Sequence, residues 1–234
     1  MPSCSPSYGR DRLGCDDPAE LRPAAFVGKR RVLSDQSHLS RHGSSALGHA
    51  NAGSIQNDDR IDRGLYAHGI CRPTRNSSGK PIGLTEEALH NFWRWFGNSR
   101  VIDEHARPLI LYHGTAIRKT SFRREGGCAG VGIYFIDSFQ TAKEYADMDA
   151  SIDGGRPIVM PVYLSMVNPY FAHGNESHSV TAERRDQLEA AGYDGIVGGG
   201  EPGDREYVAF RPEQIKSATR NGGGFDPTSS NILH

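Results

Sequence analysis

Three polar side chains stand in apolar segments, at positions where a protein core would ordinarily place hydrophobic residues. His113 ends one short apolar segment, Tyr134 interrupts a second, and Glu206 begins an alternating segment directly after a glycine-rich loop. A carboxylate in such a place can stabilise positive charge that develops on a substrate. Gly114 follows His113, and its missing side chain would let a ligand approach the backbone. These residues predict a substrate-binding site built on strands.

Short strands and short helices are expected to position these residues. Strands are predicted over residues 108–112, 132–136, 157–166, 194–197, 205–210 and 214–218. Helices are predicted over residues 85–96, 138–146 and 183–191, with Thr85 and Ser138 as N-caps. Because helices and strands do not alternate as βαβ units, the pattern favours an α+β fold. Pro161 lies inside one predicted strand, so we expect that strand at a sheet edge or with a bulge.

The first 80 residues differ in composition from the remainder. They are rich in Ser and Gly, hold 12 basic and 8 acidic side chains, and show no sustained apolar period. Such a segment buries too little apolar surface to offset its chain entropy. We therefore predict a largely disordered leader over residues 1–80, a folded domain over residues 81–228 and a C-terminal tail over residues 229–234. The leader could be a solvated tail, a non-cleaved secretion signal or a partner-binding arm.

Composition argues against several functional classes. The formal net charge of -1 is unfavourable for general nucleic-acid binding, because phosphate contacts need clustered cations. No apolar run reaches the roughly 18 residues of a membrane span. The N-terminus lacks the apolar core of a secretory signal. The four cysteines (Cys4, Cys15, Cys71 and Cys128) form no CxxC pair, which argues against structural zinc and against a disulfide framework.

Blocks of sequence around the three polar residues resemble a known family. Tyr112-His113-Gly114-Thr115, Gly132-Ile133-Tyr134-Phe135 and Glu206-Tyr207-Val208-Ala209-Phe210 resemble successive blocks of the His–Tyr–Glu branch of ADP-ribosyltransferases, which includes diphtheria toxin and the poly-ADP-ribose polymerases. The fuller pattern is most similar to the ADP-ribosyltransferase domain of bacterial and phage polyvalent proteins. Its further blocks are residues 95–99, 168–169, 192–196 and 214–218, with Asn221 and residues 225–227. The similarity covers about residues 84–227 and none of the leader.

The resemblance implies a split, two-sheet β core with short flanking helices and NAD⁺ in the cleft as co-substrate, without a metal. His113 would then hydrogen-bond a ribose, and the Gly114 backbone would pair with the nicotinamide carboxamide. Tyr134 would stack on the nicotinamide ring. Glu206 would hold the 2′-hydroxyl of the nicotinamide ribose and stabilise the oxocarbenium-like state as the glycosidic bond breaks.

Further site residues are expected on the same basis. Thr115, Phe135 and Tyr145 are predicted to complete the cofactor site. The glycine-rich loop before Glu206 is expected to contact the acceptor, with Glu201 and Asp204 as its candidate residues. Asp204 lies two residues before the catalytic glutamate, where it could orient a guanidinium.

The function implied is a mono-ADP-ribosyltransferase that modifies a macromolecule, expected to be a protein, as a bacterial effector or toxin. We expect a monomer that is cytoplasmic, or secreted and translocated without a signal peptide. A catalytically inactive NAD-binding or protein-binding module on the same fold is the main alternative. An RNA-directed transferase would need the basic leader for phosphate contacts. A metal-dependent hydrolase is disfavoured, because only His38 and His42, both in the leader, have ligand-like spacing.

Overall fold

The structure is a computed structural model and describes residues 65–67, 70–124, 130–174, 176–178 and 180–234. Within these residues the helices are α1 (Glu86–Phe96), α2 (Phe139–Asp153) and α3 (Ala182–Ala190), with a 3₁₀ turn at Pro212–Gln214. The strands are β1 (Leu65–Ala67), β2 (Ile70–Arg72), β3 (Leu111–Thr115), β4 (Ile133–Ile136), β5 (Ile158–Leu164), β6 (Tyr170–Phe171), β7 (Gly195–Val197), β8 (Glu206–Ala209) and β9 (Ile215–Ser217). The predicted α+β class is confirmed.

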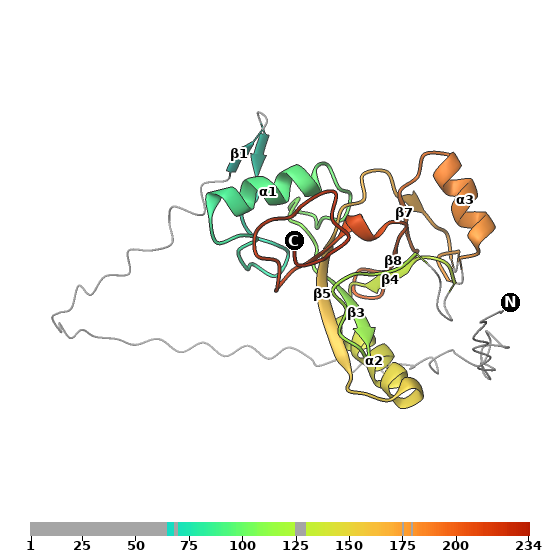
Figure 1. The fold of residues 1–234 in the computed structure, drawn as a ribbon. Coiled ribbons are helices and arrows are strands. Elements are labelled where there is room, and N and C mark those ends of the chain that lie inside the picture. Colours follow the sequence, from blue (N-terminus) through green and yellow to red (C-terminus); the bar gives the residue numbers. More distant parts are fainter. Residues whose placement is uncertain (1–64, 68–69, 125–129, 175, 179) are drawn as a thin grey trace, which may run out of the picture. The chain divides into compact units, whose positions relative to one another are not determined.

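Seven strands form one sheet in the order β6-β7-β8-β4-β3-β5-β9, and β1 and β2 form a separate hairpin. All neighbours in the large sheet are antiparallel except the β6–β7 pair. The sheet is nearly divided at its middle, because β3 and β4 are paired only through Tyr112 and Ile136. Four strands lie on one side of this split and three on the other, as the resemblance to a split core implied. The α2 helix runs alongside β3 and β5 (Figure 1).

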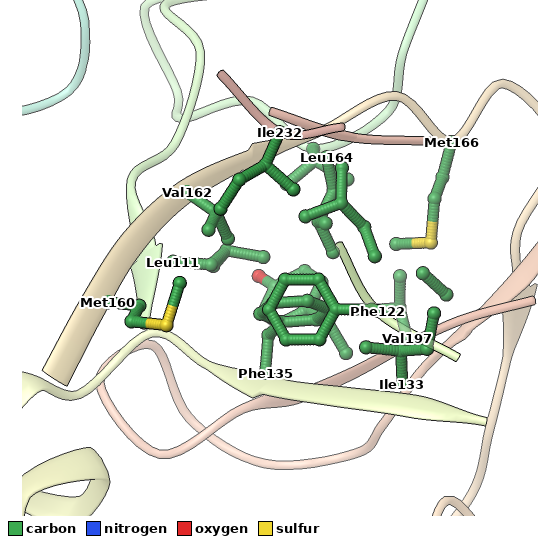
Figure 2. Close-up of a cluster of buried hydrophobic side chains, with 14 residues drawn as sticks. Leu111, Phe122, Ile133, Phe135, Met160, Val162, Leu164, Met166, Val197 and Ile232 are labelled. Atoms are coloured by element: carbon green, nitrogen blue, oxygen red, sulfur yellow. The ribbon is translucent and has the colours of Figure 1, made fainter. Parts of the chain in front are cut away.

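The main core fills the face of the sheet that lies opposite α2 around the split. It combines residues from both halves, including Leu111 and Val162 from one half and Ile133, Phe135 and Tyr207 from the other. Figure 2 shows the Phe122 and Phe135 rings together at the centre of this cluster, and their centroids lie 5.6 Å apart. Apolar burial therefore holds the two halves together where the hydrogen-bond ladder is almost absent.

Helix α1 packs through a second, aromatic cluster. Thr85 caps its N-terminus, as predicted, by accepting a hydrogen bond from the Ala88 N–H at 3.1 Å. Phe92 is fully buried and packs against Phe96, Tyr163 and Phe225 with ring centroids 5.0–5.1 Å apart. The aromatic stripe of this helix is therefore core.

The β5 strand lies inside the sheet, so the predicted edge position is wrong. It pairs with β3 on one side and with β9 on the other, in regular register and without a bulge. Pro161 is tolerated because its carbonyl oxygen accepts from the Ala218 N–H at 3.0 Å, just beyond the end of β9. In an antiparallel strand the N–H and C=O of a residue point the same way. The N–H that proline lacks would thus have pointed toward the Ala218 carbonyl, so the one bond that is missing lies just beyond the last pair of the β5–β9 ladder, Val162 and Ser217.

Residues outside the predicted domain boundaries pack against the domain. Asn76 belongs to the predicted leader, yet it is 1% exposed and donates to the Tyr163 hydroxyl at 2.8 Å. Ile232 belongs to the predicted tail, yet it is 1% exposed and joins the main core (Figure 2). The prediction of disorder for residues 1–64 lies outside the described residues. No helix in the part of the chain that the structure describes is long and apolar enough to cross a bilayer.

Candidate functional site

The candidate site is centred on the split between β3 and β4. The alternation of an antiparallel ladder places the N–H and C=O of Tyr112 and Gly114 on the side away from β5, toward β4. Pairing between the two strands stops after Tyr112 and Ile136. The backbone of Gly114 therefore faces the opening between the strands, where no ladder bond uses it. A planar amide of a ligand could bind to these two groups.

The His113 ring spans the opening from the core side. It lies in the middle of β3 rather than after the strand, because the strand runs five residues, from Leu111 to Thr115. Its Nδ1 lies 2.9 Å from the carbonyl oxygen of Tyr134. A carbonyl oxygen only accepts, so Nδ1 carries the proton and donates. The ring thereby links β3 to β4 where the backbone ladder is missing.

Burial keeps the His113 ring neutral. The ring packs against Phe122 and Phe135, with centroids 4.9 and 5.6 Å away. Burial lowers the pKa of His113 to about 4, a decrease that the hydrogen bond to the Tyr134 carbonyl opposes. Because Nδ1 is the donor, Nε2 of the neutral ring is an acceptor, and it has no hydrogen-bond partner among the described residues.

Gly114 is required for helix packing, which differs from the reason predicted. A Cβ at this position would overlap the Ala142 carbonyl oxygen and lie 2.7 Å from the Ala146 nitrogen of α2. The missing side chain thus makes room for α2, and a ligand would approach Gly114 through the opening instead. The close packing also brings Tyr145 of α2 to the site, since the same Cβ would lie 3.0 Å from the Tyr145 Cβ.

Tyr134 and Tyr145 lie on the α2 side of the sheet near Glu206. The Tyr134 hydroxyl accepts from the Val180 N–H at 3.0 Å, which fixes its half-buried ring. Burial raises the pKa of Tyr134 to about 12, and the Glu206 carboxylate adds to this. Burial also raises the pKa of Tyr145, again with a contribution from Glu206 and then from Asp204. Both phenols therefore stay protonated at neutral pH and lie within electrostatic reach of one carboxylate.

Glu206 is a half-buried carboxylate at the start of β8. It lies opposite Ile136 in the β4–β8 ladder, and its side chain is 18% exposed. Its Oε2 atom is buried and lacks a hydrogen-bond partner, and His178 Nε2 lies 3.6 Å away. Burial raises the pKa of Glu206 above its usual 4.5, while His178 and the Ser177 hydroxyl lower it and Asp204 raises it. An unpartnered buried oxygen is rare in native proteins, and a catalytic role is one of the reasons for which such a group is kept.

The loop from Gly198 to Arg205 carries both predicted acceptor residues. Its tip is a turn in which the Asp204 N–H donates to the Glu201 carbonyl at 3.1 Å. Pro202 and Gly203 occupy the middle of the turn, and Gly203 has the positive φ of 98° that a type II turn needs at its third residue. Glu201 and Asp204 therefore stand together at the base of one turn, and both are exposed.

Two predicted cofactor residues have buried side chains. Thr115 is 2% exposed, and its hydroxyl bonds the backbone of Ile117 in the turn after β3. Phe135 is 2% exposed and belongs to the main core, on the opposite face from Tyr134. The structure brings Gly114, Tyr134, Tyr145 and Glu206 to one face of the split. His113 reaches it from the other face, and Thr115 and Phe135 only support it.

Two residues near the site were missed in the sequence. His178 lies beside Glu206, and Asp137 bonds the backbone of the acceptor loop at Gly203 and Arg205. Neither stands in a motif. The only signal in the sequence was that Asp137 directly follows the apolar block of β4.

A cavity of about 340 Å³ lies elsewhere, and none of the predicted site residues lines it. Its walls include Trp95, Asp194 and Gln214. These polar groups already serve the fold: Asp194 accepts from the Val167 and Asn168 N–H groups, and the Gln214 amide donates to two carbonyls. Within the described ranges, no group of three or more His, Cys, Asp or Glu side chains could hold a metal ion.

A comparison with protein families matches the region that holds the candidate site. The family model described as "ADP-Ribosyltransferase in polyvalent proteins" matches residues 103–225, which is more than half of the chain. All predicted site residues, from His113 to Glu206, fall inside the match. We found no match to the chain among curated proteins.

Proposed function

The chain belongs to the family of ADP-ribosyltransferases found in polyvalent proteins, and from this premise we propose that it cleaves NAD⁺ and transfers ADP-ribose to a protein. One observation carries the proposal. The buried Oε2 of Glu206 has no hydrogen-bond partner and lies within electrostatic reach of Tyr134 and Tyr145 beside the split. A hydroxyl of the substrate would supply the missing partner.

The site groups have complementary tasks. In NAD⁺ the bond between C1′ of the ribose and the pyridinium nitrogen breaks, and its electron pair leaves with neutral nicotinamide. The positive charge that develops on the ribose is stabilised by the Glu206 carboxylate, which also accepts from the 2′-hydroxyl. Because nicotinamide leaves as a neutral ring, no strong acid is needed.

Orientation comes from neutral groups. Gly114 offers an N–H and a C=O to the carboxamide at the opening of the split. Tyr134 and Tyr145 offer ring faces on which the nicotinamide can stack. His113 Nε2 accepts from a ribose hydroxyl, because the hydrogen bond to Tyr134 fixes the proton on Nδ1. The acceptor then attacks C1′ and loses its proton to solvent.

The acceptor is proposed to meet the enzyme at the turn that carries Glu201 and Asp204. Nothing in the described residues resembles a site for a growing polymer, so a single transfer is proposed. We further propose a monomer that acts in the bacterial cytoplasm, or as an effector or toxin delivered without a signal peptide.

Nicotinamide release by the purified protein tests the proposal. We expect Glu206→Gln to lower the rate of release roughly 10²–10³-fold, because it removes the charge but keeps the shape. Glu104→Gln is the matched control, since Glu104 is exposed and outside the site. NAD⁺ binding without turnover by the folded wild-type protein would contradict the proposal and favour a non-catalytic binding module.

A further inference from the structure

Asp137 holds the acceptor turn in place. It directly follows β4, where Ile136 and Glu206 are the last pair of the β4–β8 ladder. Its two carboxylate oxygens accept from different backbone groups of the loop, Oδ1 from the Arg205 N–H at 2.8 Å and Oδ2 from the Gly203 N–H at 3.0 Å. Its own N–H donates to the Arg205 carbonyl at 3.3 Å. The side chain and the N–H of Asp137 thus extend the contact between β4 and the chain before β8 beyond the pair of Ile136 and Glu206.

Glu206 is held in place by the sheet and not by the contacts of Asp137 with the turn. Glu206 belongs to β8, whose residues pair with β4 on one side and β7 on the other, and its carbonyl accepts from the Gly198 N–H at 2.7 Å. Among the described residues, the four residues of the turn (201–204) have one hydrogen bond to a group outside the turn, which is the bond from the Gly203 N–H to Asp137. Just before the turn, the Gly200 carbonyl accepts from the Arg205 guanidinium at 3.0 Å. Loss of the Asp137 carboxylate would therefore loosen the turn while leaving Glu206 in the sheet.

We propose that Asp137 is a positioning residue that decides whether ADP-ribose passes to a protein or to water. This inference rests on the proposed function. Cleavage breaks the C1′–N bond and releases nicotinamide in both cases. The new bond at C1′ then forms either to the acceptor, which gives up its proton to solvent, or to a water molecule. A protein acceptor needs the ordered surface of the turn to place its nucleophile, whereas water needs no such surface.

Asp137→Asn is the sharpest variant, because it keeps the size of the side chain. The amide oxygen can still accept one of the two hydrogen bonds. The amide nitrogen would face the other backbone N–H and cannot accept from it, because both groups are donors. We expect transfer to protein to fall at least about tenfold, because misplacement by about 1 Å can cost 10²-fold. We expect nicotinamide release without acceptor, and the KM for NAD⁺, to change less than about twofold.

Asp103→Asn is the matched control. Asp103 also bonds two backbone N–H groups, those of His105 and Arg107, but in a loop between α1 and β3. Asp103 binds both N–H groups through Oδ1 and accepts from the Arg107 Nε at 2.8 Å through Oδ2, so its variant controls for the general effect of neutralising a carboxylate that holds a loop. The ratio of transfer to hydrolysis should fall in Asp137→Asn only.

The first measurement uses NAD⁺ with labelled adenine and cell lysate as the source of acceptor, and it compares the label on protein with free ADP-ribose. The second measures amide hydrogen exchange in the peptide that spans residues 198–206. Faster exchange and a lower transfer ratio in Asp137→Asn support the inference. Equal losses of release and transfer, or no loss of either, overturn it. If the wild-type protein releases no nicotinamide, the proposed function fails. Unchanged hydrogen exchange in Asp137→Asn would then also show that Asp137 does not hold the turn.

Discussion

Glu206 destabilises the folded state because its carboxylate is desolvated without a full set of partners. Burial is the largest influence on its pKa and raises it, and the opposing effects of His178 and Ser177 are smaller. A carboxyl whose pKa is raised in the folded state binds its proton more tightly there than in the unfolded chain. Its contribution to stability is therefore present below its usual value of 4.5 and is lost as the pH rises through the folded-state pKa.

Glu206→Gln is accordingly expected to stabilise the protein at neutral pH while it lowers turnover. The gain should be about 1 kcal/mol, which for a domain of this size raises the Tm by about 2–4 °C. Below pH 4.5 the wild-type carboxyl is protonated too, so the difference should vanish. Thermal unfolding of both proteins at pH 7.5 and pH 4 measures this. A lower Tm of the variant at pH 7.5 would show that the Glu206 carboxylate does not destabilise the folded state.

The 3.6 Å approach of His178 Nε2 to Glu206 Oε2 predicts a shift in the pH dependence of activity. His178 lowers the pKa of Glu206, so His178→Ala should raise it. Activity needs the ionised carboxylate, so the acid limb of nicotinamide release should move to higher pH. Because His178 is largely exposed, solvent and salt weaken its effect on Glu206. High salt should reduce the shift. His173→Ala, on the same loop, is the control, and an identical acid limb in wild type and His178→Ala would refute the prediction.

At the scale of elements, strands and helices were predictable where apolar blocks were bounded by caps or glycines. The structure confirms α1 with its Thr85 cap and places β4 and β8 within a residue of expectation. The interior position of β5 was not predictable. Proline usually marks an edge, and Pro161 is tolerated inside the sheet because the bond that it cannot donate lies beyond the end of β9. The three motif residues were found in the sequence, but the packing of α2 against Gly114 was not.

The contact between β3 and α2 sets the geometry of the site and can be tested at Gly114. Gly114→Ala would place a methyl group against the Ala142 carbonyl and 2.7 Å from the Ala146 nitrogen, both of which are backbone atoms. We expect a loss of about 1–3 kcal/mol in the free energy of unfolding. Gly222→Ala is the control, because no atom lies within 4 Å of its Cβ and its φ is ordinary. Equal stability of both variants in urea would contradict the close packing.

At the scale of the molecule, the domain is larger than its sequence pattern suggests. Lys216 is fully buried, and its ammonium donates to the carbonyls of Ser229 and Asn231 at 2.7 and 3.2 Å, which ties the C-terminal segment to β9. Asn76 contributes from the other end through its bond to Tyr163. Neither boundary shows in composition or periodicity, because isolated polar residues satisfied by distant partners leave no local pattern. Both ends of the described chain thus support the sheet that carries the site.

The most direct test of the central claim is transfer of adenine-labelled NAD⁺ into lysate protein, with nicotinamide release followed in parallel, for wild type beside Glu206→Gln. Wild type is expected to label protein and to release nicotinamide, and Glu206→Gln is expected to lose both roughly 10²–10³-fold although it remains folded. Equal labelling by the two proteins would contradict the central claim. So would the absence of both signals from folded wild-type protein in excess NAD⁺.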